Sequence, residues 1–122
     1  MANPNIVNVT SIYGKTMGAA LGTTVTTTLL TCASEKLYKI NSIIVSNVDG
    51  TDSADVTVQF YDSSATATYH LAKTITVSGK STLIVVGKDA PVYMEEADEI
   101  RAGASASSDL EIIISYEILD DA

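Results

Sequence analysis

The stretch that decides the fold is Leu110-Glu111-Ile112-Ile113-Ile114-Ser115-Tyr116-Glu117-Ile118. Apolar residues occupy every second position, and Glu111, Ser115 and Glu117 fill most of the positions between them. The side chains of a β-strand alternate between its two faces. The stretch therefore predicts a strand that closes a core with one face and meets water with the other.

Strand-like segments recur along the whole chain and are separated by short clusters of Gly, Asp, Ser and Asn. No segment shows a sustained helical period. Even spacing of short strands is typical of two packed antiparallel sheets. We therefore expect an all-β fold, an antiparallel β-sandwich that is jelly-roll-like or immunoglobulin-like. The expected strands, about eight in number, cover residues 24–31, 37–48, 56–61, 69–77, 81–86, 91–94, 100–104 and 110–118.

The pattern within these segments predicts their faces. The apolar parity of 37–48 shifts near Asn41 and Ser42, which predicts a β-bulge. The run 83–86 suits a strand covered on both faces. Two rows are expected to point inward, the first formed by Val56, Val58 and Phe60 and the second by Tyr69, Leu71, Ile75 and Val77; Thr57, Gln59 and Tyr61 are expected to point outward.

Residues 1–22 differ from the rest of the chain. They contain a weak strand signal and then a segment, 14–22, with three glycines and little side-chain bulk. We expect an N-terminal arm or an edge strand over 1–22, ordered by a neighbouring subunit, and the sandwich domain over 23–122. The alternative is that 1–22 is an ordinary first part of the same domain.

Length and charge limit the possible functions. The chain has 122 residues, the size of one domain, and its 7 basic and 15 acidic residues give a formal net charge of −8. A nucleic-acid groove needs clustered Lys and Arg, so we expect no nucleic-acid partner. The longest apolar runs are too short to span a bilayer, and residues 1–5 do not resemble a secretory signal. We therefore expect no membrane partner.

Candidate catalytic residues are few. Gly14-Lys15-Thr16 resembles the end of a phosphate-binding loop, but Val9 stands where the first glycine of that motif belongs. Cys32 and His70 could form a nucleophile and base pair. However, the parity of His70 predicts a solvent-facing or sheet-contact position, and a lone cysteine such as Cys32 is expected to be a small buried apolar side chain. We expect no enzyme activity and no cofactor.

One predicted turn carries the calcium candidates Asp49, Asp52 and Asp55. Calcium prefers several oxygen ligands, and carboxylates on a tight loop can supply them. Thr51 breaks the acidic alternation of the helix-loop-helix calcium motif, and no helix is predicted beside the turn. We therefore expect a solvated turn and no metal site.

A separate set of residues consists of candidates for contact with other proteins. They are apolar residues of the N-terminal segment, or aromatic residues outside the predicted core rows. Tyrosine is common at interfaces because it combines an apolar ring with a polar end. The interface candidates are Ile6, Val7, Val9, Ile12, Tyr13, Tyr61 and His70.

Several segments together resemble one family. They are Tyr38-Lys39-Ile40-Asn41-Ser42-Ile43-Ile44-Val45-Ser46-Asn47-Val48-Asp49-Gly50, then residues 54–58, 69–75, 91–98 and 110–117. In these segments the chain resembles a small β-sandwich structural protein of the virions of tailed bacteriophages, of the marine and cyanobacterial phage type. The resemblance covers roughly residues 37–119, and this family has no active-site motif to transfer.

The resemblance implies a capsid decoration (cement) protein that stabilises the assembled head. It implies the major capsid protein and copies of the same chain as partners, with a homotrimer as the expected oligomer. It also implies a place on the virion surface after synthesis in the host cytoplasm. The alternatives are a tail, neck or fibre component of the virion, or a lectin-like module that binds glycans or calcium.

Overall fold

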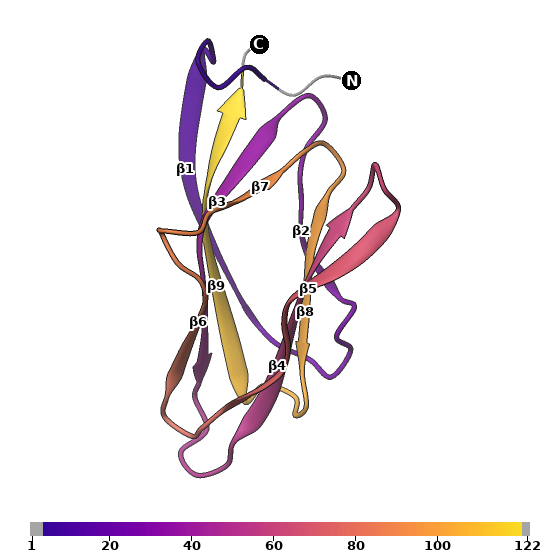
Figure 1. Cartoon of the computed structure of the whole chain (residues 1–122). Coiled ribbons are helices and arrows are strands. Elements are labelled where there is room, and N and C mark those ends of the chain that lie inside the picture. The colour runs from indigo at the N-terminus through magenta and orange to yellow at the C-terminus, as the bar shows by residue number, and fades with distance from the viewer. Residues whose placement is uncertain (1–3, 121–122) are drawn as a thin grey trace.

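The structure is a computed structural model that describes residues 4–120, and these form nine β-strands and no helix (Figure 1). The prediction of an all-β fold is confirmed. The strands are β1 (Ser11–Ala20), β2 (Thr28–Thr31), β3 (Leu37–Asn47), β4 (Ala54–Asp62), β5 (Ala67–Val77), β6 (Thr82–Val86), β7 (Val92–Met94), β8 (Glu99–Ala104) and β9 (Leu110–Asp120).

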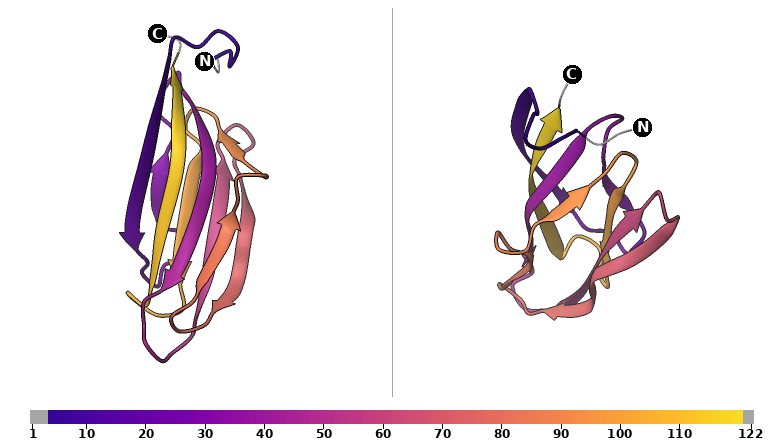
Figure 2. Two further views of the ribbon diagram at one scale, coloured as in Figure 1. Left: turned by 90° about the vertical axis from the view of Figure 1, so that its left-hand side faces the viewer. Right: turned by 45° about the horizontal axis from the view of Figure 1, so that its top comes forward.

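The strands form two antiparallel sheets that lie face to face (Figure 2). Sheet A contains β1, β9, β3 and β6 in that order, and the short β7 also pairs with β3. Sheet B contains β2, β8, β4 and β5. Along the chain the pairs are nested, because β4 pairs with β5, β3 with β6, β2 with β8 and β1 with β9. Of the two expected topologies, this order is that of a jelly roll.

The core lies between the inner faces of the two sheets. In sheet A the fully buried side chains include those of Ile43 on β3 and Ile112 and Ile114 on β9. In sheet B, Val56 and Val58 of β4 are equally buried. The alternation predicted for 110–118 is confirmed, since Leu110, Ile112, Ile114 and Tyr116 are buried and Glu111 and Ile113 are exposed.

The predicted bulge in β3 is also confirmed. Ile40 pairs with Tyr116 and Ser42 pairs with Ser115, so Asn41 has no partner in the ladder. The Asn41 side chain instead donates from Nδ2 to Oε2 of Glu117 at 3.1 Å. The extra residue allows Ile40 and Ile43, which have opposite parity, to enter the same core.

The row predicted for β5 is wrong in part. Two register shifts interrupt its pairing with β4, and Lys73 and Thr74 together oppose Thr57. Thr74 has a positive φ of 53°, and its amide donates to Oγ1 of Thr57 at 3.1 Å. These bulges turn Ala72 into the core. Tyr69 and Ile75 pair with Phe60 and Val56 but are exposed, because β5 is the edge of sheet B, whereas Val77 is buried as predicted.

The cover of two other strands differs from what the pattern predicts. The run 83–86 predicts a strand covered on both faces, but Ile84 of β6 is 65 % exposed, because nothing in residues 4–120 covers the outer face of sheet A at that point. Thr57 and Gln59 of β4 lie on the outer face of sheet B, as predicted, and both are nevertheless buried. For Thr57 the cause is the connection between β1 and β2, which lies against the outer face of sheet B where Thr57 pairs with Gly103.

Gly103 is the position where this connection comes closest to β8. A Cβ at Gly103 would lie 2.6 Å from the backbone oxygen of Thr24 and from Cα of Val25. We expect Gly103→Ala to lower the free energy of unfolding by about 1–3 kcal/mol, because backbone must move to admit the methyl group. Gly14→Ala is the control, since no atom lies within 4 Å of its added Cβ. Urea denaturation measures both, and equal stability of the two variants would contradict the close approach.

Each end of the sandwich is held by one buried polar side chain. At one end, Asn47 donates from Nδ2 to the carbonyl oxygens of Asp52 and Val77 and accepts at Oδ1 from the amide of Asp49. At the other end, the carboxylate of Asp98 accepts from the amide of Ser63 at 2.9 Å, its hydroxyl at 3.2 Å and the amide of Glu95 at 2.9 Å. Both residues are only 3 % exposed.

The N-terminal residues divide into an arm and a strand. Ser11–Ala20 form β1, which pairs with β9 over ten residues and is the edge of sheet A. Residues 4–10 form the arm, which lies at the same end of the sandwich as the end of β9 (Figure 1). Residues 1–3 and 121–122, which belong to the predicted arm and sandwich, lie outside the described residues.

Candidate interaction surfaces

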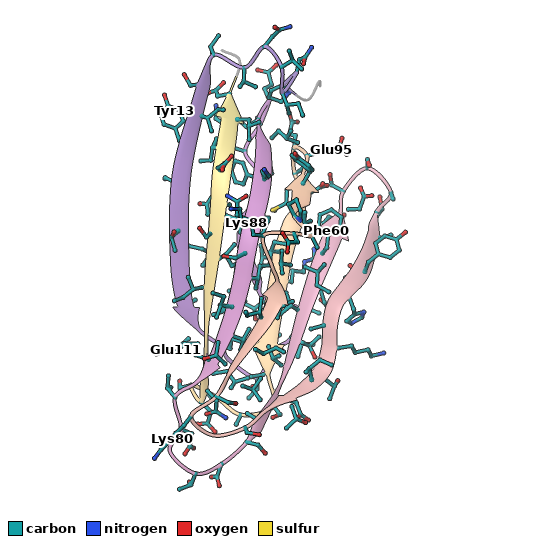
Figure 3. The ribbon with its side chains drawn as sticks, turned by 60° about the vertical axis from the view of Figure 1, so that its left-hand side comes forward. Tyr13, Phe60, Lys80, Lys88, Glu95 and Glu111 are labelled. Carbon is teal, nitrogen blue, oxygen red and sulfur yellow. The ribbon has the colours of Figure 1, made fainter. Side chains whose placement is uncertain are left out.

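Five of the seven interface candidates lie together at the arm end. We call them the arm patch: Ile6, Val7, Val9, Ile12 and Tyr13. Val7 is 84 % exposed, Ile6, Ile12 and Tyr13 are each more than half exposed, and Val9 is half-buried. Figure 3 shows Tyr13 beside β1, on the side away from β9. Large apolar side chains that are this exposed and gathered in one short segment typically mark an interaction surface.

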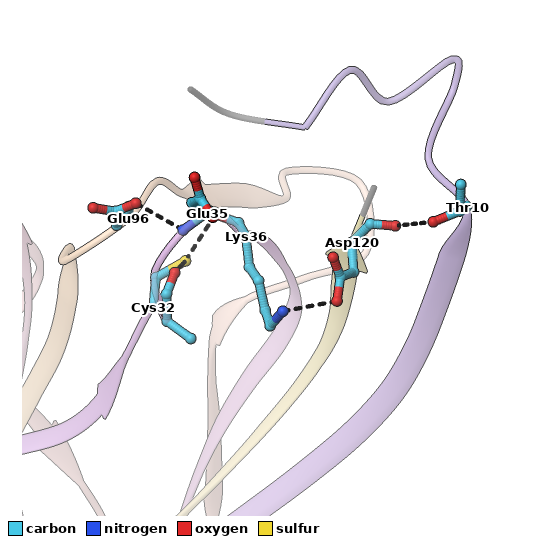
Figure 4. Close-up of polar contacts among 7 residues, drawn as sticks. Thr10, Cys32, Glu35, Lys36, Glu96 and Asp120 are labelled. Carbon is cyan, nitrogen blue, oxygen red and sulfur yellow. Dashed lines mark hydrogen bonds and ion pairs between the residues drawn. The ribbon is translucent and has the colours of Figure 1, made fainter. Parts of the chain in front are cut away.

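Hydrogen bonds fix the arm to the last strand (Figure 4). The amide and hydroxyl of Thr10 donate to the carbonyl oxygen of Asp120 at 3.0 and 3.1 Å. The carboxylate of Asp120 accepts from Nζ of Lys36 at 2.7 Å, and this bond raises the pKa of the lysine above its ordinary value. Within the arm, the amide of Val7 donates to Oδ1 of Asn5 at 2.9 Å. The arm patch is therefore presented on a tethered segment.

The other two candidates lie on sheet B and do not join the arm patch. Tyr61 packs beneath Arg101, whose guanidinium carbon lies 4.3 Å from the ring centroid. Arg101 also pairs with Glu99 at 2.8 Å, and the hydroxyl of Thr28 and Arg101 together lower the pKa of Glu99. His70 is exposed and places Nε2 at 3.2 Å from Nε2 of Gln59.

Sequence reasoning missed a row of isoleucines on the outer face of sheet A. Ile44 of β3 pairs with Ile113 of β9 on one side and with Ile84 of β6 on the other. Residues paired in this way share a face of the sheet. Ile113 is 47 % exposed and Ile84 is 65 % exposed. The signal in the sequence is an apolar residue at the out-of-phase position of β3 and of β9, and in β6 the continuous apolar run 83–86.

The calcium candidates are held by local hydrogen bonds. Oδ1 of Asp49 accepts from the amides of Thr51 and Asp52, and these bonds lower the pKa of the Asp49 carboxyl. Oδ1 of Asp55 accepts instead from the hydroxyl of Thr76 at 2.7 Å. Among residues 4–120, no three side chains of His, Cys, Asp or Glu are grouped so that they could hold a metal ion.

Cys32 and His70 have different surroundings in the structure. The Cys32 thiol contacts the carbonyl oxygen of Lys36 at 3.3 Å, whereas the His70 ring contacts Gln59 on sheet B. Burial raises the pKa of the Cys32 thiol to about 11. The prediction that Cys32 is buried is confirmed.

The high pKa and burial of Cys32 give a direct prediction. At about pH 8 we expect a thiol reagent such as DTNB to leave the native protein almost unlabelled, because both thiolate and access are lacking. The same reagent should label the thiol fully in denaturant. Rapid stoichiometric labelling of the folded protein would contradict the buried position.

Residues 4–120 contain no helix that is long and apolar enough to cross a membrane. No protein-family model matches the chain, and no curated protein sequence is significantly similar to it. Function must therefore be inferred from the fold and from the surfaces described above.

Proposed function

We propose that this protein is a structural component of a tailed-bacteriophage virion, and specifically a capsid decoration protein that binds the major capsid protein on the assembled head. The observation that carries the proposal is the arm patch, four of whose five apolar side chains are more than half exposed on a segment tethered to the sandwich. The resemblance of residues 37–119 supports it. The jelly-roll fold is compatible with this role but does not distinguish it from a lectin-like role, since capsid and lectin domains both have this fold.

The arm patch lies beside a free strand edge. β1 is paired on one side with β9, and no other strand of residues 4–120 pairs with its second side. Such an edge presents backbone donors and acceptors to which a partner strand can bond. In β1 only Lys15 carries a charge, so little opposes such pairing. A capsid protein can therefore bind through main-chain bonds to β1 and through apolar contacts to the arm.

Charge supports attachment to protein rather than to packaged DNA. The formal net charge of −8 repels a phosphate backbone and keeps unattached copies soluble. Burial of each exposed Val or Ile of the arm patch on the capsid contributes roughly 1.5–3 kcal/mol, before the cost of ordering. Many weak attachments over a symmetric shell would then stabilise the head together.

Copy number in purified virions tests the proposal. Quantitative mass spectrometry against the major capsid protein is expected to give hundreds of copies per particle. A count of about six or twelve would instead place the protein at the tail or neck, where rings of that symmetry occur. Absence from the virion would refute any virion role.

The role of the arm patch is tested by binding to heads that lack the protein. We expect the double variant Ile6→Asp with Val7→Asp to bind at least tenfold more weakly, because charge replaces both apolar contacts. Val48→Asp is the matched control, since Val48 is 55 % exposed in the connection after β3 and outside the arm patch. Equal loss of binding by both variants, or by neither, would remove the arm patch as the attachment site.

A further inference from the structure

An open groove lies between β5 and β6, the edge strands of the two sheets on one side of the sandwich (Figure 2). Its apolar lining includes Leu71 and Ile75 of β5 and Leu83, Ile84 and Val85 of β6, and its volume is about 520 Å³. We call it the β5–β6 groove. Among residues 4–120, β5 pairs only with β4 and β6 pairs only with β3, so each strand has a free edge.

Side chains from the core faces of both sheets are left partly uncovered at the β5–β6 groove. Ile75 pairs with the fully buried Val56, so both point to the core side of sheet B, yet Ile75 is 41 % exposed. On the facing sheet, Leu83 pairs with the fully buried Val45 but is only half-buried. A segment that enters the groove can therefore bury apolar surface from both sheets.

The edge of β6 suits pairing with an added strand. Thr82–Val86 contains no charged residue, and Ile84 within it is 65 % exposed. An exposed apolar edge of this kind is a ready template for another strand. β5 is less suited, because bulges and a lysine, here Lys73, are features that oppose edge pairing. An added segment can therefore bond to β6 while it packs against β5.

The charge near the groove is opposite in sign to that of the whole chain. Residues 63–88, which include both strands, contain three of the 7 basic residues and none of the 15 acidic ones, although the formal net charge is −8. Lys73 lines the groove, and Lys80 and Lys88 precede and follow β6 (Figure 3). Among residues 4–120, none of these three lysines takes part in an ion pair. This local excess of positive charge favours a partner that carries carboxylates.

We propose that the β5–β6 groove binds an extended segment of another protein in which apolar residues alternate with Asp or Glu. Alternate side chains of a strand lie on opposite faces. The apolar side chains of the segment then cover Leu83 and Ile75, and its carboxylates stay in water within the field of the three lysines. An acyl chain matches the apolar lining but offers no main-chain groups to β6. The inference goes beyond the proposed function and does not depend on it.

A synthetic peptide tests the proposal on the full chain. The probe is a fluorescent peptide of about eight residues in which Glu and Val alternate, and the control peptide has Lys in place of Glu. Fluorescence anisotropy at about 50 mM salt should give a Kd on the order of 100 µM for the Glu peptide, because a short segment buries little surface. The Lys peptide should bind at least tenfold more weakly. The NMR chemical-shift changes caused by the Glu peptide should be largest in β5 and β6.

Two pairs of variants locate the bound peptide. Ile75→Asp should raise the Kd at least tenfold, because it places a carboxylate in the apolar contact. Its matched control is Ile113→Asp, which adds the same charge at an exposed isoleucine on the outer face of sheet A and should leave the Kd unchanged. Lys73→Glu should raise the Kd about fivefold, whereas Lys15→Glu, on the edge strand β1 at the other side of sheet A, should change it less than twofold. Circular dichroism confirms that each variant is folded.

Other outcomes decide against the proposal. If the Glu peptide shows no saturable binding up to about millimolar concentration, or if the Lys peptide binds equally well, the groove does not select an acidic segment. Shifts centred on β1 would move the site to that free edge. If dodecanoate binds in the groove and the Glu peptide does not, the occupant is an acyl chain, and a dimer that Ile75→Asp disrupts would make it a second copy. None of these results bears on copy number in the virion, so the two proposals fail separately.

Discussion

Ile114→Ala is expected to lower the free energy of unfolding by about 2–5 kcal/mol, the largest loss of any single change considered for this chain. Ile114 is fully buried at the centre of β9, where the facing sheet leaves no route for water to fill the space. The variant loses both the transfer free energy of the deleted carbons and the contacts around the cavity they leave. Guanidinium denaturation gives the value directly.

The adjacent residue supplies the control. Ile113 lies on the same strand but points to the outer face and is 47 % exposed. Ile113→Ala should cost at most about 1 kcal/mol, mainly through strand propensity. Similar losses for the two variants would mean that the faces of β9 are assigned the wrong way round.

Asp98→Ala is expected to cost about 3 kcal/mol, because it leaves the Ser63 amide, the Ser63 hydroxyl and the Glu95 amide without their acceptor. These donors lie in two different connections, between β4 and β5 and between β7 and β8. Since Asp98 is buried, water cannot replace its carboxylate without opening that end of the sandwich. Thermal unfolding followed by circular dichroism measures the loss.

Asp62→Ala is the matched control for this effect. Asp62 also accepts three hydrogen bonds, from the amide and hydroxyl of Ser64 and the amide of Ala65, and these bonds lower its pKa. They lie at the surface, where water can take over the donors, so a loss of less than about 1 kcal/mol is expected. If Asp98→Ala lowers the free energy of unfolding no more than Asp62→Ala does, the buried carboxylate of Asp98 does not stabilise the β4–β5 and β7–β8 connections.

The sequence predicted best where one strand is regular and one face is covered. Alternation identified β9, and the parity shift at Asn41 identified the bulge in β3, because both patterns depend on local periodicity. It failed on β5, where bulges bring Ala72 into the core, and where Tyr69 and Ile75 are exposed because β5 is the edge of sheet B. The positive φ of Thr74 cannot be recognised from the hydrophobic pattern of the sequence, since the pairing of β5 with β4 sets the register there.

Burial by segments distant in the sequence cannot be predicted from local periodicity. Asp98 lies in an acidic segment, yet it is buried because the connection at Ser63 packs against it. Likewise, periodicity identifies Ile113 as out of phase but cannot show that Ile44 and Ile84 stand beside it. The arm patch was easier to find, because its members are close in sequence. Tyr61 and His70 lie on the other sheet, a fact that only the topology reveals.

The position of β9 has a consequence for how the chain matures on the ribosome. β9 follows the other strands of residues 4–120 in the sequence and lies between β1 and β3, so β1 and β3 do not pair with each other. Until β9 has been synthesised, the edges of β1 and β3 that it covers remain open, and long-range closure of this kind is slow. A nascent chain stalled before residue 110 should therefore be protease-sensitive and prone to aggregate, and synthesis through β9 should complete the sheet.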